Sequence, residues 1–111
     1  MRIINAGRQT GKSTYLLKYA NEHGYTVLVS TISAKNKMKE EIILNKYHNV
    51  KVFTVHEFLH GLNGARFGIN DKVCVDNLDA VLEEIIGFTI DTATCCIPFS
   101  NDLVTYDEEK E

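Results

Sequence analysis

The sequence predicts an α/β fold in three layers: a five-stranded, mainly parallel sheet flanked by helices. Short runs rich in β-branched and other apolar residues alternate with longer amphipathic segments, which is the order of a parallel sheet with crossover helices. Several of these runs are apolar almost throughout, as expected of strands that are covered on both faces. We expect strands at residues 3–4, 25–31, 50–55, 72–76 and 88–97.

Helices are expected between these strands. The first begins near Lys12 and ends where Gly24 suits the left-handed cap position. Ser33 is a suitable cap for a second helix over about residues 34–47. Two further helices are expected, a short one directly after Thr54 and a longer one from about residue 78 to residue 87.

Lysines cover the surface of the second expected helix. A solvated helix face is one interpretation of this charge. Contact with the phosphates of a nucleic acid strand is the other, and the sequence leaves both open. The residues are Lys35, Lys37, Lys39 and Lys46.

Composition limits the class of protein. The chain has 111 residues, of which 44% are hydrophobic and 24% charged, with a net charge of −3. It fits one globular domain, which we expect over residues 1–99, followed by an acidic, flexible tail over 100–111. No apolar run approaches the ~20 residues of a membrane span, and no signal-peptide pattern precedes the first strand. We therefore expect a cytoplasmic protein without a membrane partner. The cysteines, Cys74, Cys95 and Cys96, have no metal-binding spacing and are expected to be buried thiols.

A phosphate-binding motif lies between the first strand and the first helix. Residues 6–13, AGRQTGKS, fit the phosphate-loop pattern with alanine in the first glycine position. Glycines allow the backbone N–H groups to turn inward around a phosphate, and the helix N-terminus adds a positive dipole end. The alternative is an ordinary turn. We expect the nucleotide to be bound by Gly7, Arg8, Gln9, Thr10, Gly11, Lys12, Ser13 and Thr14.

Two side chains of this motif have specific expected roles. Lys12 would reach the β- and γ-phosphates of a nucleotide, and the Ser13 hydroxyl would bind Mg²⁺. Asp76, at the end of an apolar strand some 60 residues later, has the layout of a Walker B carboxylate that would complete the Mg²⁺ site. The alternative for Asp76 is an exposed strand end or a helix cap.

Asn77 occupies the position after this aspartate. Hydrolytic relatives of such sites usually have glutamate there, which activates the attacking water. An amide can orient a water molecule but cannot accept its proton, so general-base catalysis is doubtful. We expect Lys12, Asp76 and Asn77 to carry whatever catalysis the chain performs.

A second motif suggests a different function, zinc-dependent hydrolysis. Residues 56–60, HEFLH, match the HExxH pattern of zinc proteases. That chemistry needs both histidines on one helix and a third ligand, and nearby glycines leave the helix little room. Thr54 and Glu57 also fit a capping box, which explains the glutamate without a metal.

The order of elements and motifs resembles the nucleotide-binding domain of helicase- and terminase-type P-loop NTPases. Residues 7–13, GRQTGKS, are similar to the loop of viral terminases and related phage ATPases. Residues 54–58, TVHEF, resemble a segment between the two Walker motifs of many helicases, and residues 92–94, TAT, resemble a motif that couples the γ-phosphate to the rest of a helicase. The resemblance implies that residues 89–94 lie between the strand at 2–5 and the strand at 73–76.

Three functions follow as hypotheses. The first is an ATP- and Mg²⁺-binding module with weak or partner-dependent ATPase activity, acting on single-stranded DNA or RNA, of the freestanding kind found in phages and thus in the host cytoplasm. Its site would be completed by a protein partner or by self-association. The second is a small nucleoside or nucleotide kinase, because residues 12–17 resemble the opening of thymidine kinases. The third is a non-catalytic binder of a host or phage protein.

Overall fold

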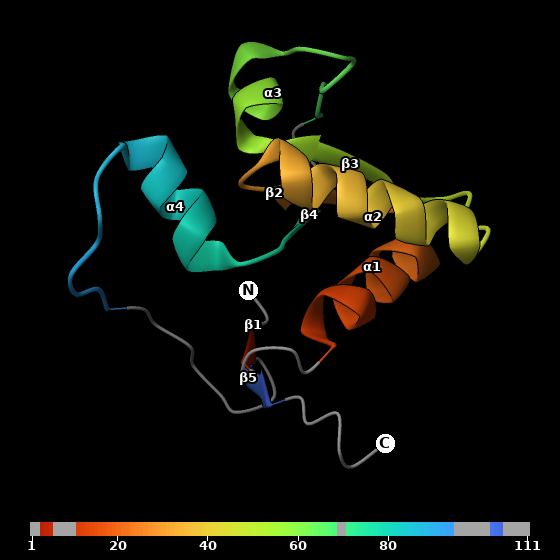
Figure 1. Ribbon diagram of the computed structural model, residues 1–111, viewed down its shortest axis with the longest axis horizontal. Coiled ribbons are helices and arrows are strands. Elements are labelled where there is room, and N and C mark those ends of the chain that lie inside the picture. Colours follow the sequence, from red (N-terminus) through yellow and green to blue (C-terminus); the bar gives the residue numbers. More distant parts are fainter. Residues whose placement is uncertain (1–2, 6–10, 69–70, 95–102, 106–111) are drawn as a thin grey trace.

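The computed structural model describes residues 3–5, 11–68, 71–94 and 103–105 of the chain (Figure 1). These residues form a small α/β domain in which strands and helices alternate through most of the chain. The strands are β1 (Ile3–Asn5), β2 (Thr26–Val29), β3 (Lys51–Thr54), β4 (Val73–Val75) and β5 (Leu103–Thr105), and the helices are α1 (Lys12–His23), α2 (Ile32–Leu44), α3 (Val55–His60) and α4 (Leu78–Ile86).

The central sheet has three strands in the order β3-β2-β4, and all its pairs are parallel. Leu28 of β2 aligns with Phe53 on one side and with Val75 on the other. A second, two-stranded parallel sheet joins β1 to β5. Because parallel neighbours point the same way, the carboxyl ends of β2, β3 and β4 meet at one edge of the central sheet.

The expected five-stranded sheet is not present. Residues 88–94 do not form a strand in the structure, and residues 95–97 of that predicted strand lie outside its described part. The Ile90 N–H donates to the Glu83 carboxylate (2.7 Å) instead of joining a ladder. The strand beside β1 is β5, which comes from the segment expected to be a tail. The α/β class is confirmed, and the predicted single sheet is wrong.

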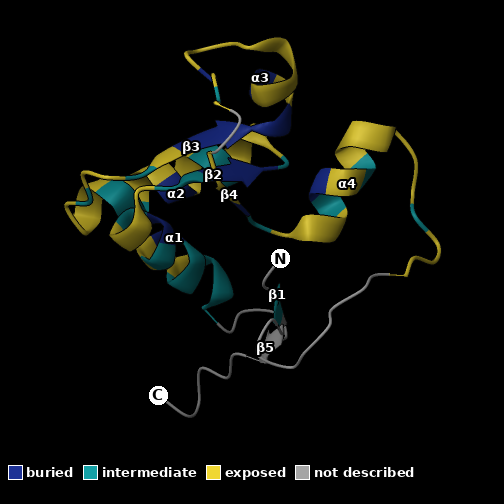
Figure 2. Cartoon of the chain, turned by 180° about the vertical axis from the view of Figure 1, so that it is seen from behind, coloured by how far each residue is buried: buried dark blue, intermediate teal, exposed yellow. Residues whose placement is uncertain are grey.

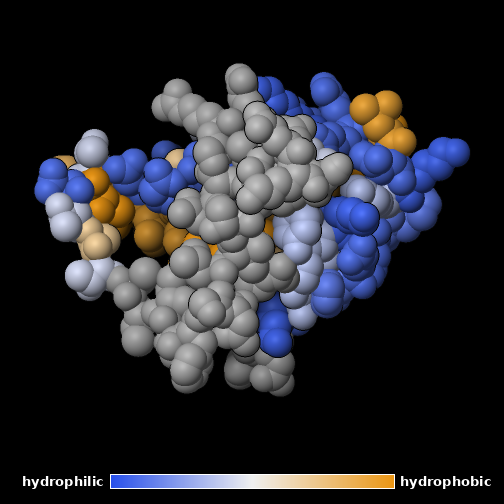
Figure 3. Space-filling model, turned by 90° about the horizontal axis from the view of Figure 1, so that it is seen from below, coloured by the Kyte–Doolittle hydropathy of each residue, from blue (hydrophilic) through white to orange (hydrophobic). Residues whose placement is uncertain are grey.

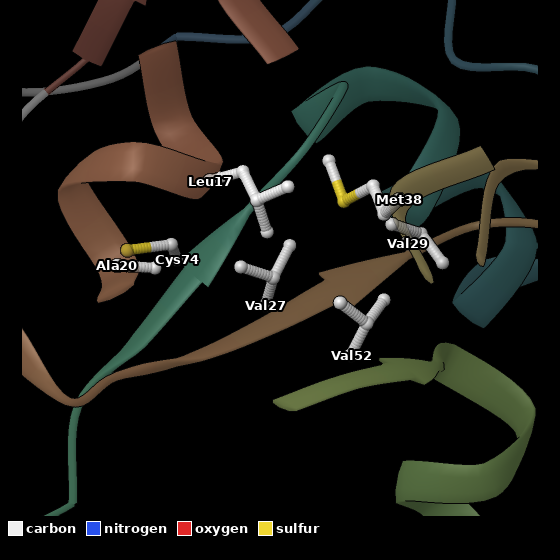
Figure 4. Packing of buried hydrophobic residues seen from close by; sticks show 7 residues of the cluster. All are labelled: Leu17, Ala20, Val27, Val29, Met38, Val52 and Cys74. Atoms are coloured by element: carbon white, nitrogen blue, oxygen red, sulfur yellow. The ribbon is translucent and has the colours of Figure 1, made fainter. Parts of the chain in front are cut away.

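One face of the central sheet carries the main hydrophobic core. Helices α1 and α2 cover this face (Figure 4). Leu17, Val27 and Val29 are fully buried there, and Met38 of α2 packs beside them. Cys74 belongs to the same cluster, so it is a buried thiol as expected. The side chains of this face determine how α1 sits relative to β4.

The opposite face is covered less completely. Leu28 and Phe53 pack there against Ala65 and Phe67 of the loop after α3. Helix α4 contributes a single buried side chain, Val81, and Figure 2 shows most of the helix as exposed.

Several helix ends match their sequence signals. Gly24 and Gly87 end α1 and α4 in the left-handed conformation (φ 71° and 84°). Helix α2 begins earlier than expected, because the Thr31 side chain, rather than that of Ser33, accepts from the Ala34 N–H (3.1 Å). The helix also ends earlier, at Leu44.

A buried ion pair joins α2 to α3. The Lys35 Nζ lies 2.6 and 2.8 Å from the two carboxylate oxygens of Glu57, and their side chains are 12% and 8% exposed. Glu57 also accepts from the Thr54 N–H (2.9 Å) in the capping box and from the Asn63 amide. Lys35 is therefore not a surface lysine, which corrects the expectation for that residue; Lys37, Lys39 and Lys46 are exposed.

Burial raises the pKa of Glu57, but the ion pair and hydrogen bonds to Lys35, with those to Thr54 and Asn63, outweigh it and lower the pKa from 4.5 to about 2. A carboxyl group with a depressed folded-state pKa stabilises the fold above its unfolded pKa and loses that contribution as the pH falls. The contribution is on the order of 3 kcal/mol.

We predict that Glu57→Gln lowers the free energy of unfolding by about 3 kcal/mol at pH 7, because Lys35 is left buried without its counter-charge. The difference from the wild type should shrink as the pH falls from about 4.5 to about 2. Urea unfolding at several pH values measures it, with the exposed Glu40→Gln as the control. An equal loss of stability in both variants would contradict this account of the ion pair.

Candidate functional site

The first turn of α1 brings two predicted site residues together. Gly11 is the N-cap of this helix and adopts a left-handed conformation (φ 80°) without a side-chain cap. Lys12 and Ser13 follow directly as the first helical residues. The first N–H groups of a helix have no intrahelical partner, and its N-terminus attracts anions. The loop residues Gly7, Arg8, Gln9 and Thr10 lie outside the described part of the chain.

Asp76 reaches the same place from β4. Its N–H donates to the Leu28 carbonyl oxygen (3.0 Å), which extends the contact with β2 past the last residue of the strand. Its Oδ1 accepts a hydrogen bond from the Ser13 Oγ (2.9 Å). Two residues 63 positions apart in sequence, predicted separately from two motifs, are therefore in direct contact.

The surroundings of Asp76 disfavour the charged form of its side chain. Burial raises the pKa of this carboxyl group, while the Ser13 hydrogen bond and the positive charge of Lys12 oppose that rise. Burial prevails, so the pKa lies above its usual value of 3.8. A carboxylate that lacks full charge compensation in this way is a favourable ligand for a cation, which would restore that compensation.

The two oxygen atoms have a spacing that suits a small metal ion. Adjacent ligands of an octahedral Mg²⁺, each about 2.1 Å from the ion, are about 3 Å apart. The Ser13 Oγ and the Asp76 Oδ1 are 2.9 Å apart. Within the part of the chain that the structure describes, no group of three or more His, Cys, Asp or Glu side chains could hold a metal ion. A Mg²⁺ bound here would complete its shell with phosphate oxygens and water, as is usual for this ion.

Asn77 and Thr14 are placed differently from this pair. Asn77 is the N-cap of α4 in a left-handed conformation (φ 61°), it makes no side-chain cap bond, and it is exposed. Asp76 is thus not the cap of that helix. The Thr14 hydroxyl donates to Glu41 of α2 (3.3 Å).

A cavity of about 690 Å³ adjoins the site. Lys12, Asp76 and Asn77 are among the residues that line it, and β1 contributes Ile3 and Ile4. Two aromatic residues that the sequence did not single out, Tyr19 and Tyr25, also line the cavity. Nothing in the sequence indicated this role, because a tyrosine on an amphipathic helix, as Tyr19 is, or next to a strand, as Tyr25 is, is usually interpreted as a core residue.

The HExxH segment forms no site of this kind. Helix α3 has six residues, and the rings of His56 and His60 are 4.4 Å apart. Glu57 is buried, with its carboxylate bound by Lys35 and the capping box, so it is not available to activate a water molecule. The capping-box interpretation is confirmed.

No protein-family model matches the sequence, and no match to the chain was found among curated proteins or solved structures. Among the described residues, no helix is long and apolar enough to cross a membrane.

We predict that Asp76→Asn stabilises the protein at pH 7, because it removes a partly buried charge while the amide oxygen still accepts from Ser13. A carboxyl group with a raised folded-state pKa costs stability as the pH rises above its unfolded pKa. The gain should therefore disappear below pH 3.8 and grow above it. Thermal unfolding of both proteins between pH 3 and pH 7 measures this.

The matched control is Asp79→Asn, which removes an exposed charge from the first turn of α4. That charge favours the helix N-terminus, so this variant should be slightly less stable than the wild type. An Asp76→Asn protein that is less stable than the wild type at pH 7 would show that the carboxylate is structural.

Proposed function

We propose that the chain binds ATP with Mg²⁺ at the N-terminus of α1, as a P-loop NTPase-like module. The observation that carries the proposal is the hydrogen bond between Ser13 and Asp76. Ser13 belongs to a sequence with the phosphate-loop pattern, and Asp76 directly follows a parallel strand, at the edge where ligands of α/β sheets are usually bound.

Each residue would have a defined part in binding. Ser13 and Asp76 would hold Mg²⁺, and Lys12, which lies near enough to influence the pKa of Asp76, would contact the phosphates. The N-terminus of α1 would add its N–H groups and its dipole. The bound Mg²⁺ would neutralise charge on the phosphate oxygens.

Hydrolysis by the isolated chain should be slow. Asn77 cannot act as a general base, which is worth roughly 10²–10⁴-fold in rate. An arginine finger is worth roughly 10³–10⁵-fold. Arg66, exposed in the loop after α3, is our candidate for supplying one by self-association. Turnover far below the ~1–100 s⁻¹ of kinases is expected, and steady-state phosphate release over a range of protein concentrations measures it.

The proposal also includes the process in which the nucleotide-binding module would act. The resemblance to helicase and terminase ATPases supports a module that works with a partner on single-stranded DNA or RNA, in the cytoplasm of a host if a phage encodes it. Exposed Lys37 and Lys39 on α2 would contact the phosphates of such a strand, and a solvated helix face is the alternative interpretation of their charge. Binding of ATP without turnover, together with a stable protein partner, would favour the non-catalytic alternative.

We predict that Lys12→Ala abolishes detectable ATP binding and changes the free energy of unfolding by less than about 1 kcal/mol. Calorimetric titration with Mg²⁺ and ATP measures the ATP affinity, and urea unfolding measures the free energy of unfolding. Lys18→Ala, an exposed lysine on the same helix, should bind as the wild type does. Unchanged ATP affinity in a folded Lys12→Ala protein would overturn the proposal.

A further inference from the structure

The two histidines of the HExxH segment lie side by side on the surface of α3. His56 and His60, the histidine pair, are four positions apart, which places them one turn apart on the same face of the helix. Both side chains are exposed, and their ring centres are 4.4 Å apart with an angle of 52° between the ring planes. Within the described residues, neither imidazole forms a hydrogen bond or an ion pair. Their nitrogens are therefore available to a ligand from solution.

The histidine pair is separate from the candidate nucleotide site. None of the described residues that line the cavity beside that site belongs to α3. In Figure 1, α3 lies at the top of the molecule, with the central sheet between it and the small sheet of β1 and β5. Figure 3 is seen from below, from the end that carries β1 and β5, so α3 lies on the far side of that view. A ligand on the pair can thus be studied apart from a nucleotide.

Buried contacts on the other side of α3 hold the helix in place. Val55 is 1% exposed, and Glu57 is buried with its carboxylate bound by Lys35 and by the Thr54 N–H. Gly61 ends the helix in a left-handed conformation (φ 62°). The backbone that carries the histidine pair is thereby fixed, with the pair turned to solvent. Two ligands held ready in this way lose little freedom when they bind an ion.

We propose that His56 and His60 bind one divalent transition-metal ion, Ni²⁺ or Cu²⁺, as two adjacent ligands, with water in the remaining positions. An imidazole nitrogen about 2.0–2.1 Å from a metal places its ring centre about 3.2 Å from that metal, so ring centres are about 4.5 Å apart for ligands at 90° and about 5.2 Å apart at a tetrahedral angle. The observed 4.4 Å matches the 90° arrangement. Square-planar, tetragonal and octahedral ions, which Cu²⁺ and Ni²⁺ form, have adjacent ligands at this angle.

The chemistry of the two ligands separates this site from the one for Mg²⁺. Imidazole nitrogen suits copper, nickel and zinc, and the affinity of such sites rises from Mn²⁺ to Cu²⁺ along the divalent series. Mg²⁺ and Mn²⁺ instead prefer the oxygen ligands that Ser13 and Asp76 offer. The two sites should therefore take different ions from a mixture.

The site keeps the metal-binding half of the HExxH motif without its catalytic half. Glu57, which activates water in that motif, is occupied by Lys35 and the capping box. Within the described part of the chain, no third His, Cys, Asp or Glu side chain joins the pair. The site thus binds a metal without hydrolysing a peptide. It requires no nucleotide, so the inference stands or falls separately from the proposed function.

Titration of the isotope-labelled full chain with Ni²⁺, without nucleotide, tests the proposal. The chain has four histidines, and the NMR signals of all four rings can be followed together. Paramagnetic Ni²⁺ should broaden the ring signals of His56 and His60 first, with those of His23 and His48 affected only at higher concentration, and calorimetry should give one ion per chain. Broadening that starts elsewhere, or in all four rings together, would overturn the proposal. One ion per two chains would assign the metal to a dimer and would overturn it as well.

Removing one ligand gives an independent readout. His60→Gln leaves a single imidazole, so the Ni²⁺ affinity should fall by roughly 10²-fold, because the second bond no longer forms within one chain. Ni²⁺ should raise the melting temperature of the wild type, since it binds the folded helix, and should not raise that of the variant. His48→Gln is the matched control, because His48 is exposed and lies on no such pair. Equal Ni²⁺ affinities for the two variants would contradict the two-histidine site.

Discussion

The parallel pairing of β4 with β2 is the constraint on which the candidate site depends. It fixes where β4 ends, and the hydrogen bond from the Asp76 N–H to the Leu28 carbonyl oxygen holds the next residue at that edge. The hydrophobic core, in which Leu17 and Ala20 of α1 cluster with Cys74 of β4, positions α1 so that its first turn lies beside the end of β4. Ser13 and Asp76 are in contact because the strand pairing positions Asp76 and the core packing positions Ser13. A slip of β4 by one residue would exchange its two faces and remove Asp76 from Ser13.

Two buried or partly buried acidic residues, Glu57 and Asp76, have pKa values that are shifted in opposite directions. Glu57 is surrounded by donors, and its pKa is depressed, so its charge stabilises the fold. Asp76 has one hydroxyl donor and a nearby lysine, and its pKa is raised, so its charge is a cost. A cost of this kind is typical of residues whose partner is a ligand rather than the protein. The contrast separates the glutamate of HExxH, whose charge is compensated within the protein, from Asp76, whose charge is not fully compensated.

The parts of the fold that sequence predicted well are those decided locally. Gly24 and Gly87 end their helices because few other residues adopt a left-handed conformation at so little cost, and Thr54 with Glu57 forms a capping box within four residues. The pairing of Lys35 with Glu57 was missed, because a lysine on a helix gives no sign of a partner 22 positions away. Residues 88–94 have strand composition, but a strand also needs neighbours on its edges, and composition alone does not supply them. Of the candidate site, Ser13 and Asp76 were predicted and meet, whereas the cavity beside them had no local signal.

The central claim is that the Ser13–Asp76 pair marks a site for a metal–nucleotide complex. Paramagnetic Mn²⁺ in place of Mg²⁺, added with a non-hydrolysable ATP analogue to the labelled protein, tests it most directly. The account predicts that the NMR signals of Lys12, Ser13 and Asp76 broaden first, that those of β3 broaden least, and that Asp76→Asn removes the effect. Broadening centred on His56 and His60, or no analogue-dependent broadening at Ser13, would contradict it.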